Sequence, residues 1–353
     1  MNKTKLAVLL FLATILTFAV VLSLMFRRTA NRSEARKQEI NLIVYAPKSF
    51  IDSFGPGDAI KKQFEEKCQC TVEYIDVGGS ATTIEKIKLD EKRRVDVVVG
   101  MDLLLLDRVF HSIRVQDLEK PQVELRDELK DMVFPRFVPY DWAPMGFIYR
   151  KGELKESQSL QAFLAEAPEK SVALEDPEVS STGLEWLYWL YKTATLNQSL
   201  NQSKFEGALQ SLRRVTAMVA PTWSSAYGLF KKNQAKAVFS YQTSLVYHRA
   251  VEKDYRYEFM QFSEGHPAQI EYAFVPDACW NCTVAKKFVE NLLTPEVQKI
   301  LAEKNFMLPV IKNVELSEEF QKLPKVKILP REGLDQFARR QSEIIEEWKK
   351  QNP

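Results

Sequence analysis

The sequence predicts an α/β protein of two lobes, which are joined by extended crossings and enclose a ligand cleft. Three observations predict this class. Apolar, β-branched segments alternate with amphipathic ones near the N-terminal side, as in parallel sheets covered by helices. Extended stretches near residues 139 and 268 then connect the two predicted α/β units. Finally, 353 residues with 45% apolar content can bury a core large enough for two lobes.

The first α/β unit follows the pattern strand, helix, strand, helix, strand. Its predicted strands are almost continuously apolar, which indicates burial on both faces. A glycine pair, Gly78 and Gly79, ends the second strand and opens the second helix. The predicted strands are 40–46, 70–77 and 95–102, and the predicted helices are 58–67 and 78–92.

The middle and the C-terminal part of the chain predict a second unit. The segment 137–154 is aromatic and extended, because Pro139 and Pro144 exclude a helix. Further strands are predicted at 171–177, 235–244 and 269–280, and helices at 159–167, 183–196, 285–305 and 335–350. The predicted division is a signal or anchor with its tether at 1–37, a first lobe of 38–139 and 268–330, and a second lobe of 140–267 and 331–353.

The N-terminal segment predicts export. Lys3 and Lys5 precede an uncharged apolar run, Leu6 to Phe26, which is long enough to span a bilayer. No clean cleavage site follows, so the run is either a cleaved signal or an uncut membrane anchor. Two arginines after the run argue against the anchored orientation. Both alternatives place the protein in the periplasm, free or tethered to the inner membrane.

The four cysteines agree with an exported protein. They form two tight pairs, Cys68 with Cys70 and Cys279 with Cys282. Two short-range disulfides or one cross-link between the pairs would be permitted outside the cytoplasm. The long gap between the pairs lacks the spacing of zinc fingers or ribbons, so no metal site is predicted.

Three loops carry hydroxyl groups at predicted helix starts. One contains Gly79 and Ser80, the second Ser180 and Ser181, and the third runs from Tyr241 through Gln242 and Thr243 to Ser244. Free N–H groups and hydroxyls at helix starts suit phosphate or carboxylate oxygens, although they also serve as ordinary helix caps. Three such loops around one cleft predict an anion site.

Aromatic residues supply the second part of the predicted site. Trp223 and Tyr247 lie close in sequence to the third loop, and Trp223 is predicted to precede a helix, where it would face the cleft. Tyr227 and Phe230 have the spacing of a helix face that packs in the core. An aromatic wall beside an anion pocket suits a flat or cationic ring that carries a phosphate.

The order of several segments resembles the thiamine-binding periplasmic proteins of ABC transporters. These segments are WSSAYGLF, SYQTSLVYH, FSEGH, DPEVSSTGL and FMLPV, and the match runs from about residue 41 to the C-terminal helix. The resemblance implies the type II fold of two-lobed periplasmic binding proteins. It also implies capture of thiamine, thiamine monophosphate or thiamine diphosphate and delivery to an ABC permease in the inner membrane, with no cofactor and no catalysis.

The resemblance assigns roles to individual residues. Gly79, Ser80, Ser180, Ser181 and the loop from Tyr241 to Ser244 would meet the phosphate, and Trp223 and Tyr247 would contact the rings. The sequence departs from the family pattern at four places. The family has an aspartate before the glycine that corresponds to Gly79, a tyrosine where Pro47 stands, and tryptophans where Phe54 and Phe306 stand.

Other functions are less well supported by the residues. A net charge of +2 with interleaved charges argues against nucleic acid as a partner. Only three histidines exist, and Glu264 with His266 reads as a structural pair rather than a catalytic one. A ferric site would need adjacent tyrosines, but Gln242 follows Tyr241. A polyamine receptor would need several carboxylates in the cleft. Asp102 and Asp141 are candidate partners for a ligand cation. Another phosphorylated compound also remains an alternative ligand.

Overall fold

The structure is a computed structural model that describes residues 41–89, 94–120, 122–195 and 202–351. Residues Leu42–Pro353 form one compact unit. The predicted signal or anchor, Leu6 to Phe26, lies outside the described residues. Within the described ranges, no helix has the length and apolar character needed to cross a membrane.

The strands form one mixed sheet, which confirms the predicted α/β class. Their order is β2-β1-β3-β9-β4-β7-β5-β6, and β8 and β10 also pair with β4. Pairing is parallel between β1 and β3 and among β7, β5 and β6, whereas β9 runs antiparallel to both β3 and β4. The strands are β1 (Asn41–Ala46), β2 (Thr71–Asp76), β3 (Val97–Asp102), β4 (Val138–Arg150), β5 (Val172–Glu175), β6 (Thr216–Ala220), β7 (Ala237–Tyr241), β8 (Tyr257–Phe259), β9 (Ala268–Phe274) and β10 (Leu308–Pro309).

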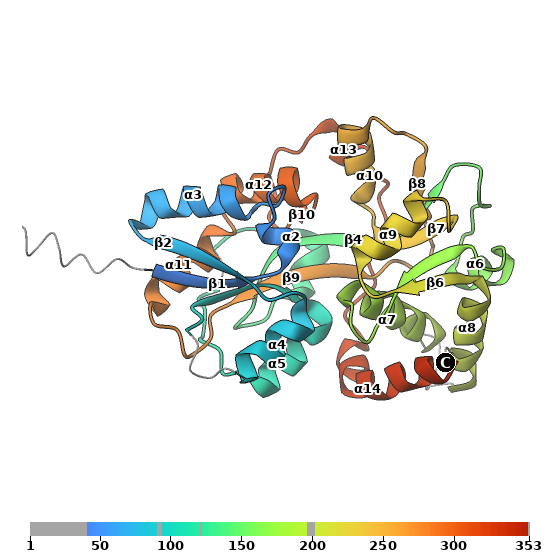
Figure 1. Cartoon of the computed structure of the whole chain (residues 1–353), viewed down its shortest axis with the longest axis horizontal. Helices are drawn as coiled ribbons and strands as arrows, with labels where there is room; N and C mark the ends of the chain where they lie inside the picture. Colours follow the sequence, from blue (N-terminus) through green and yellow to red (C-terminus); the bar gives the residue numbers. More distant parts are fainter. Residues whose placement is uncertain (1–40, 90–93, 121, 196–201, 352–353) are drawn as a thin grey trace, which may run out of the picture. The chain divides into compact units, whose positions relative to one another are not determined.

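Strand β4 is shared by both halves of the sheet (Figure 1). Its first part, as far as Pro144, pairs with β9, and its second part, from Met145, pairs with β7. All of its residues are buried, so its unbroken apolar and aromatic sequence reflects burial on both faces. The residues predicted to be the two extended crossings are therefore β4 and β9.

Helices flank the sheet on both sides of β4. Those of the first half are α2 (Lys48–Ile51), α3 (Gly57–Cys68), α4 (Ser80–Leu89), η1 (Leu103–Leu105), α5 (Leu106–Ser112), η2 (Asp127–Met132), α11 (Cys282–Asn291) and α12 (Pro295–Asn305). The others are α6 (Leu160–Glu166), α7 (Ser181–Thr195), α8 (Gln202–Val215), α9 (Trp223–Lys231), α10 (Ser244–Tyr247), the π-helical turn η3 (His248–Glu252), α13 (Glu318–Gln321) and α14 (Leu334–Gln351).

Two local predictions were wrong. The single helix predicted over 285–305 is divided into α11 and α12, because Thr294 caps a new helix and Pro295 occupies its first position. The pair α8 and β6 was not predicted. Most residues of β6 are only half-buried, so its short sequence shows no clear alternation.

The cysteines form two short-range disulfides, Cys68–Cys70 and Cys279–Cys282. Of the two arrangements that the sequence left open, this is the one without a cross-link between the pairs. Asp96 holds the second disulfide loop, because one of its carboxylate oxygens accepts the N–H groups of Trp280 and Asn281.

Candidate functional site

The candidate site begins where α9 starts. Thr222 caps the helix and forms a capping box with Ser225. Trp223 is therefore the first residue of α9, whereas the sequence predicted it before the helix. Its indole Nε1 donates to Ser240 Oγ at 2.8 Å, and its ring lies 5.0 Å from that of Tyr227 and 5.8 Å from that of Tyr241. The indole is half-buried and held on three sides.

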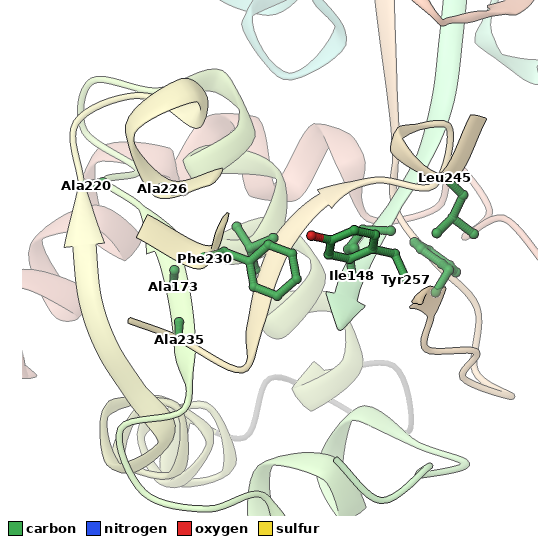
Figure 2. Close-up of a cluster of buried hydrophobic side chains, with 10 residues drawn as sticks. Ile148, Ala173, Ala220, Ala226, Phe230, Ala235, Leu245 and Tyr257 are labelled. Atoms are coloured by element: carbon green, nitrogen blue, oxygen red, sulfur yellow. The ribbon is translucent and has the colours of Figure 1, made fainter. Parts of the chain in front are cut away.

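The rest of α9 packs into the protein, as the sequence predicted. Ala226 and Phe230 belong to a buried apolar cluster that includes Ile148 of β4 and Tyr257 of β8 (Figure 2). Tyr227 is half-buried, and its hydroxyl lies 2.6 Å from His248 Nε2. Burial raises the pKa of Tyr227 well above its ordinary value, so its hydroxyl stays protonated. The helix is thus fixed from behind, and Trp223 stands at its exposed end.

The loop after β7 runs beside Trp223. Tyr241 ends the strand and is half-buried, and Thr243 and Ser244 are buried. Ser244 Oγ lies 3.0 Å from Ser240 Oγ, which in turn accepts from Trp223. The amide of Gln242 donates to the carbonyl of Pro324 at 2.7 Å. The structure therefore brings Trp223, Tyr241 and Ser244 together, and it uses the Gln242 amide to anchor the loop.

Tyr247 lies one helical turn further on, at the end of α10. Its side chain is 41% exposed, and its ring meets that of Phe306 edge-on at 5.4 Å. The two rings form a second aromatic edge.

Gly79 and Ser80 lie where β2 turns into α4. Gly78 has the left-handed backbone, φ +75°, that the turn requires. Ser80 is buried, donates to the Gly100 carbonyl at 2.8 Å and accepts from the Asp102 N–H at 3.1 Å. Its hydroxyl thus joins the start of α4 to the end of β3. Gly79 is exposed, and its carbonyl accepts from two threonines of α4.

Ser180 and Ser181 begin α7. Ser180 Oγ lies 2.9 Å from Thr182 Oγ1 and accepts weakly from the Gly183 N–H at 3.4 Å, which is the geometry of a helix cap. Ser181 is half-buried. Within the described residues, no hydrogen bond links these two serines to Trp223 or Tyr241. The anion site predicted from the three loops stays a prediction.

Sequence reasoning missed most of a set of buried carboxylates near these loops. Asp102 ends β3, Asp141 lies on β4 and Glu271 on β9, and Glu271 is the Cα partner of both aspartates. Glu175 ends β5, and Glu185 lies on α7. Asp102, Asp141 and Glu175 are each 0% exposed. The sequence signal was weak, because Asp102, Asp141, Glu185 and Glu271 each lie alone inside an apolar segment, and Glu175 with Asp176 ends another.

Burial raises the pKa of all five carboxyl groups. The pKa of Asp102 rises to about 7, because burial outweighs its hydrogen bond from Leu104 and the charge of Glu271 adds to the effect. After burial, the Glu271 charge is the main cause that raises the pKa of Asp141. Part of the set therefore carries protons at neutral pH.

The predicted pair of Glu264 and His266 was wrong. Glu264 accepts from the Leu160 N–H, whereas His266 accepts from the Phe262 N–H through Nε2 at 3.0 Å and so donates from Nδ1 to the Met145 carbonyl at 3.0 Å. Burial lowers the pKa of His266 to about 4. The imidazole is thus a neutral structural group.

Two cavities lie apart from the predicted residues. One, of about 380 Å³, is lined mainly by apolar side chains of η1, α5 and α14, and the other, of about 500 Å³, by residues around β8 such as Glu258 and Arg249. Neither is lined by a residue that the sequence assigned to the site.

The chain is similar in sequence and fold to known solute-binding proteins. Residues 42–307 match the family model of bacterial extracellular solute-binding proteins. A thiamine-binding periplasmic protein of Brucella melitensis is 31% identical over 90% of this chain and 91% of its own. A solved periplasmic thiamin binding protein superposes with a TM-score of 0.80 at 30% identity, covering 89% of this chain and 97% of its own. A ferric binding protein from Campylobacter jejuni shares the fold at 16% identity, with a TM-score of 0.72 over 88% of this chain and 99% of its own.

Proposed function

The chain belongs to the bacterial extracellular solute-binding proteins, among the relatives of the thiamine-binding periplasmic proteins, and from this premise we propose that it captures thiamine and its phosphate esters. The two-lobed fold is that of its relatives. On binding, two lobes close about a hinge. The first lobe consists of residues 38–139 and 268–330, and the second of residues 140–267 and 331–353. The change of partner along β4, at Pro144 and Met145, supports a hinge in the crossing strands.

One observation carries the proposal. Trp223 is held at the start of α9 by Ser240, Tyr227 and Tyr241, so its indole is oriented before any ligand arrives. A half-buried, preoriented aromatic ring is suited to stack on a flat heteroaromatic ring, and little side-chain entropy is lost on binding. Tyr247 and Phe306 provide a second aromatic edge of the same kind.

The phosphate end of the ligand belongs at the helix starts. Backbone N–H groups at the N-termini of α4 and α7 attract anions through the helix dipole. The hydroxyls of Ser80 and Ser180 hold these turns in place, and the backbone donors are the groups that would face a phosphate.

Delivery completes the proposed function. The protein works on the outer side of the cytoplasmic membrane and hands its ligand to an ABC permease, as the resemblance implies. The run Leu6 to Phe26 directs export and, if uncut, tethers the protein. N-terminal sequencing and membrane fractionation of the expressed chain decide between these two forms.

A second candidate ligand is a polyamine. A polyamine receptor needs several carboxylates, and this chain has Asp102, Asp141, Glu175 and Glu185, which are buried, and the half-buried Glu271. Ferric ion is less well supported, because the residue after Tyr241 is a glutamine whose amide is already bound to Pro324.

Titration of the full chain in mild detergent tests the proposal. Thiamine, its two phosphates, spermidine and Fe³⁺ are added while tryptophan fluorescence and heat are recorded. We expect quenching and a Kd in the micromolar range or below for at least one thiamine form. No response to any thiamine form would overturn the proposed function.

A further inference from the structure

Four buried carboxylates and the half-buried Glu271 interact electrostatically with one another or with Tyr241, and we call Asp102, Asp141, Glu175, Glu185 and Glu271 the carboxylate cluster. We propose that the carboxylate cluster is the subsite for the positive charge of the ligand, and that binding of the cation expels protons from it. This inference deepens the proposed function and rests on it. The class of group that it takes is a quaternary or protonated nitrogen.

Three members form a row across neighbouring strands. Glu271 on β9 lies opposite Asp102 of β3 on one side and opposite Asp141 of β4 on the other. Directly opposed residues have Cβ atoms about 4.5–5.5 Å apart and project from the same face of the sheet. Like charges in such positions repel each other, so this row is destabilising in the absence of protons or a cation.

The row is only partly satisfied by the protein. Glu271 accepts from the Tyr140 hydroxyl at 2.6 Å, Asp141 from the Asn305 amide at 2.9 Å and Asp102 from the Leu104 N–H at 2.8 Å. The buried atom Asp102 Oδ2 and both carboxylate oxygens of Glu175 have no partner, whereas Asp141 shares a hydrogen bond with the Glu271 carboxyl. Buried acceptors without donors cost free energy, and a nearby cation or donor from a ligand would offset part of this cost.

The uncharged Gln269 also has an acceptor oxygen without a hydrogen-bond partner. Gln269 lies two residues from Glu271 on the same strand, is 3% exposed and hydrogen-bonds to the Glu271 carboxylate. Its Oε1 has no partner. The hydrogen bond to Glu271 fixes the orientation of the Gln269 amide. Its oxygen can therefore accept a hydrogen bond from an N–H group of the ligand.

No protein cation balances the cluster. Across the described residues, no Lys, Arg or His lies within ion-pair distance of its five members. The groups that face it are its own carboxyls and four phenols, those of Tyr140, Tyr188, Tyr241 and Tyr272. Isolated buried carboxylates are costly, and such groups take up protons instead.

Tyr241 connects the cluster to the aromatic residues. Its ring contacts Trp223, and after burial its pKa is raised by the charges of Glu271, Asp102, Asp141 and Glu175. Glu271 is half-buried, so the row reaches solvent at its central member. A ring stacked on Trp223 would therefore place its positive charge within electrostatic range of the carboxylates.

A bound cation favours the ionised carboxyls. Asp102, with a pKa of about 7 in the free protein, loses its proton to the buffer when the cation arrives. Affinity for a cation therefore rises with pH between about 6 and 8, by at most tenfold per pH unit for each proton released.

Calorimetry of the full chain tests the inference. Thiamine, whose thiazolium charge is permanent, is titrated at pH 7 in phosphate and in Tris, which differ in ionisation enthalpy. We expect release of a fraction of one proton or more and an affinity several-fold tighter at pH 8 than at pH 6. Thiochrome, the uncharged oxidised form, should bind without this pH dependence.

Glu271→Gln is the decisive variant, because it removes one charge and keeps the shape. We expect at least tenfold weaker binding of thiamine and a smaller proton release. Glu258→Gln is the matched control, since Glu258 also accepts from a tyrosine, Tyr149, at 3.1 Å but lies on β8 away from the cluster. Circular dichroism checks the fold of both, and the proton count of the unmodified chain keeps the test valid if Glu271→Gln fails to fold.

The outcomes separate the two proposals. Thiamine binding without proton exchange, and unchanged in Glu271→Gln, would overturn the cation subsite and leave the proposed function intact. Binding of spermidine with proton release, but of no thiamine form, would support the subsite and overturn the proposed function. Binding of neither cation would overturn both.

Discussion

Asp102→Asn tests the electrostatics of the carboxylate cluster without any ligand. Asp102 ends β3, is fully buried and caps η1 through the Leu104 N–H. Asparagine retains an acceptor oxygen for this N–H and resembles the protonated carboxyl in shape. The substitution therefore removes the titration and keeps the cap.

The magnitude follows from the pKa. The Asp102 carboxyl titrates at about 7 in the folded protein, compared with 3.8 for an ordinary aspartate. The folded state keeps its proton over this interval while the unfolded state has lost it, so stability falls as pH rises from about 4 to about 7. A shift of about three units corresponds to a cost of up to about 4 kcal/mol above pH 7. Coupling to Glu271 and Glu185 spreads this cost over several groups.

Urea unfolding at pH 4.5, 6 and 8, followed by tryptophan fluorescence, measures the effect on the full chain. We expect the unfolding midpoint of Asp102→Asn, relative to the unmodified chain, to rise between pH 4.5 and pH 8. The control is Asp117→Asn, because the Asp117 side chain is 83% exposed. Parallel pH profiles for Asp102→Asn and the unmodified chain would refute the argument.

Three further predictions concern the ligand wall, a buried histidine and a close helix contact. Trp223→Ala should weaken thiamine binding at least tenfold in a fluorescence or heat titration, and its lost contacts with Ser240, Tyr227 and Tyr241 should also cost about 1–3 kcal/mol in unfolding; Trp223→Phe, which keeps a ring, should lose less of both, and equal binding by all three chains would exclude Trp223 from the site. His266 is neutral with a pKa of about 4, so its contribution to the free energy of unfolding should be constant above about pH 6.5 and fall by up to about 3 kcal/mol toward pH 4. His266→Gln should lack this acid-dependent loss. An acid profile in thermal melts equal to that of the unmodified chain would contradict the prediction. Gly183→Ala would place a Cβ 2.5 Å from the Asp176 carbonyl oxygen and should lower the melting temperature by several degrees, whereas Gly207→Ala in α8, whose Cβ would meet no atom within 4 Å, should leave it unchanged or raise it.

The fold was predictable where one physical signal dominated. Pro139 and Pro144 excluded a helix, and the buried strand β4 lies there. The apolar residues of β1 and β3 indicated strands buried on both faces, and both are buried strands. The division of α11 from α12 was missed, although Thr294 and Pro295 carry the ordinary signals of a helix start. The amphipathic pattern continues across this break, and periodicity was given more weight than the cap.

The candidate site was predictable only in part, because sequence shows which groups are present but not which are already used. Ser80 was assigned to a ligand for its hydroxyl, yet that hydroxyl bonds to Gly100 and Asp102. Gln242 was assigned to a ligand for its amide, which binds Pro324. Glu271 drew no attention inside an apolar strand, because its two aspartate neighbours are distant in sequence and meet it only through the antiparallel pairing of β9.

The positions of the carboxylate oxygens without hydrogen-bond partners affect which form of thiamine the proposed site should prefer. Unpartnered carboxylate oxygens lie at the ends of β3 and β5, and in their ionised form these groups repel a phosphate and attract a thiazolium. For a ligand that carries both charges, the two proposals together predict that its cation points at Glu271 and its phosphate points away, toward the backbone donors of α4 or α7. The start of α4 is close to the cluster, because the Asp102 N–H donates to Ser80 of that helix. A second phosphate charge at this helix start is therefore harder to keep away from the carboxylates. With the proposed cation subsite, we therefore expect tighter binding of thiamine and its monophosphate than of the diphosphate, and this order of affinity should become steeper as pH rises and the cluster loses its protons.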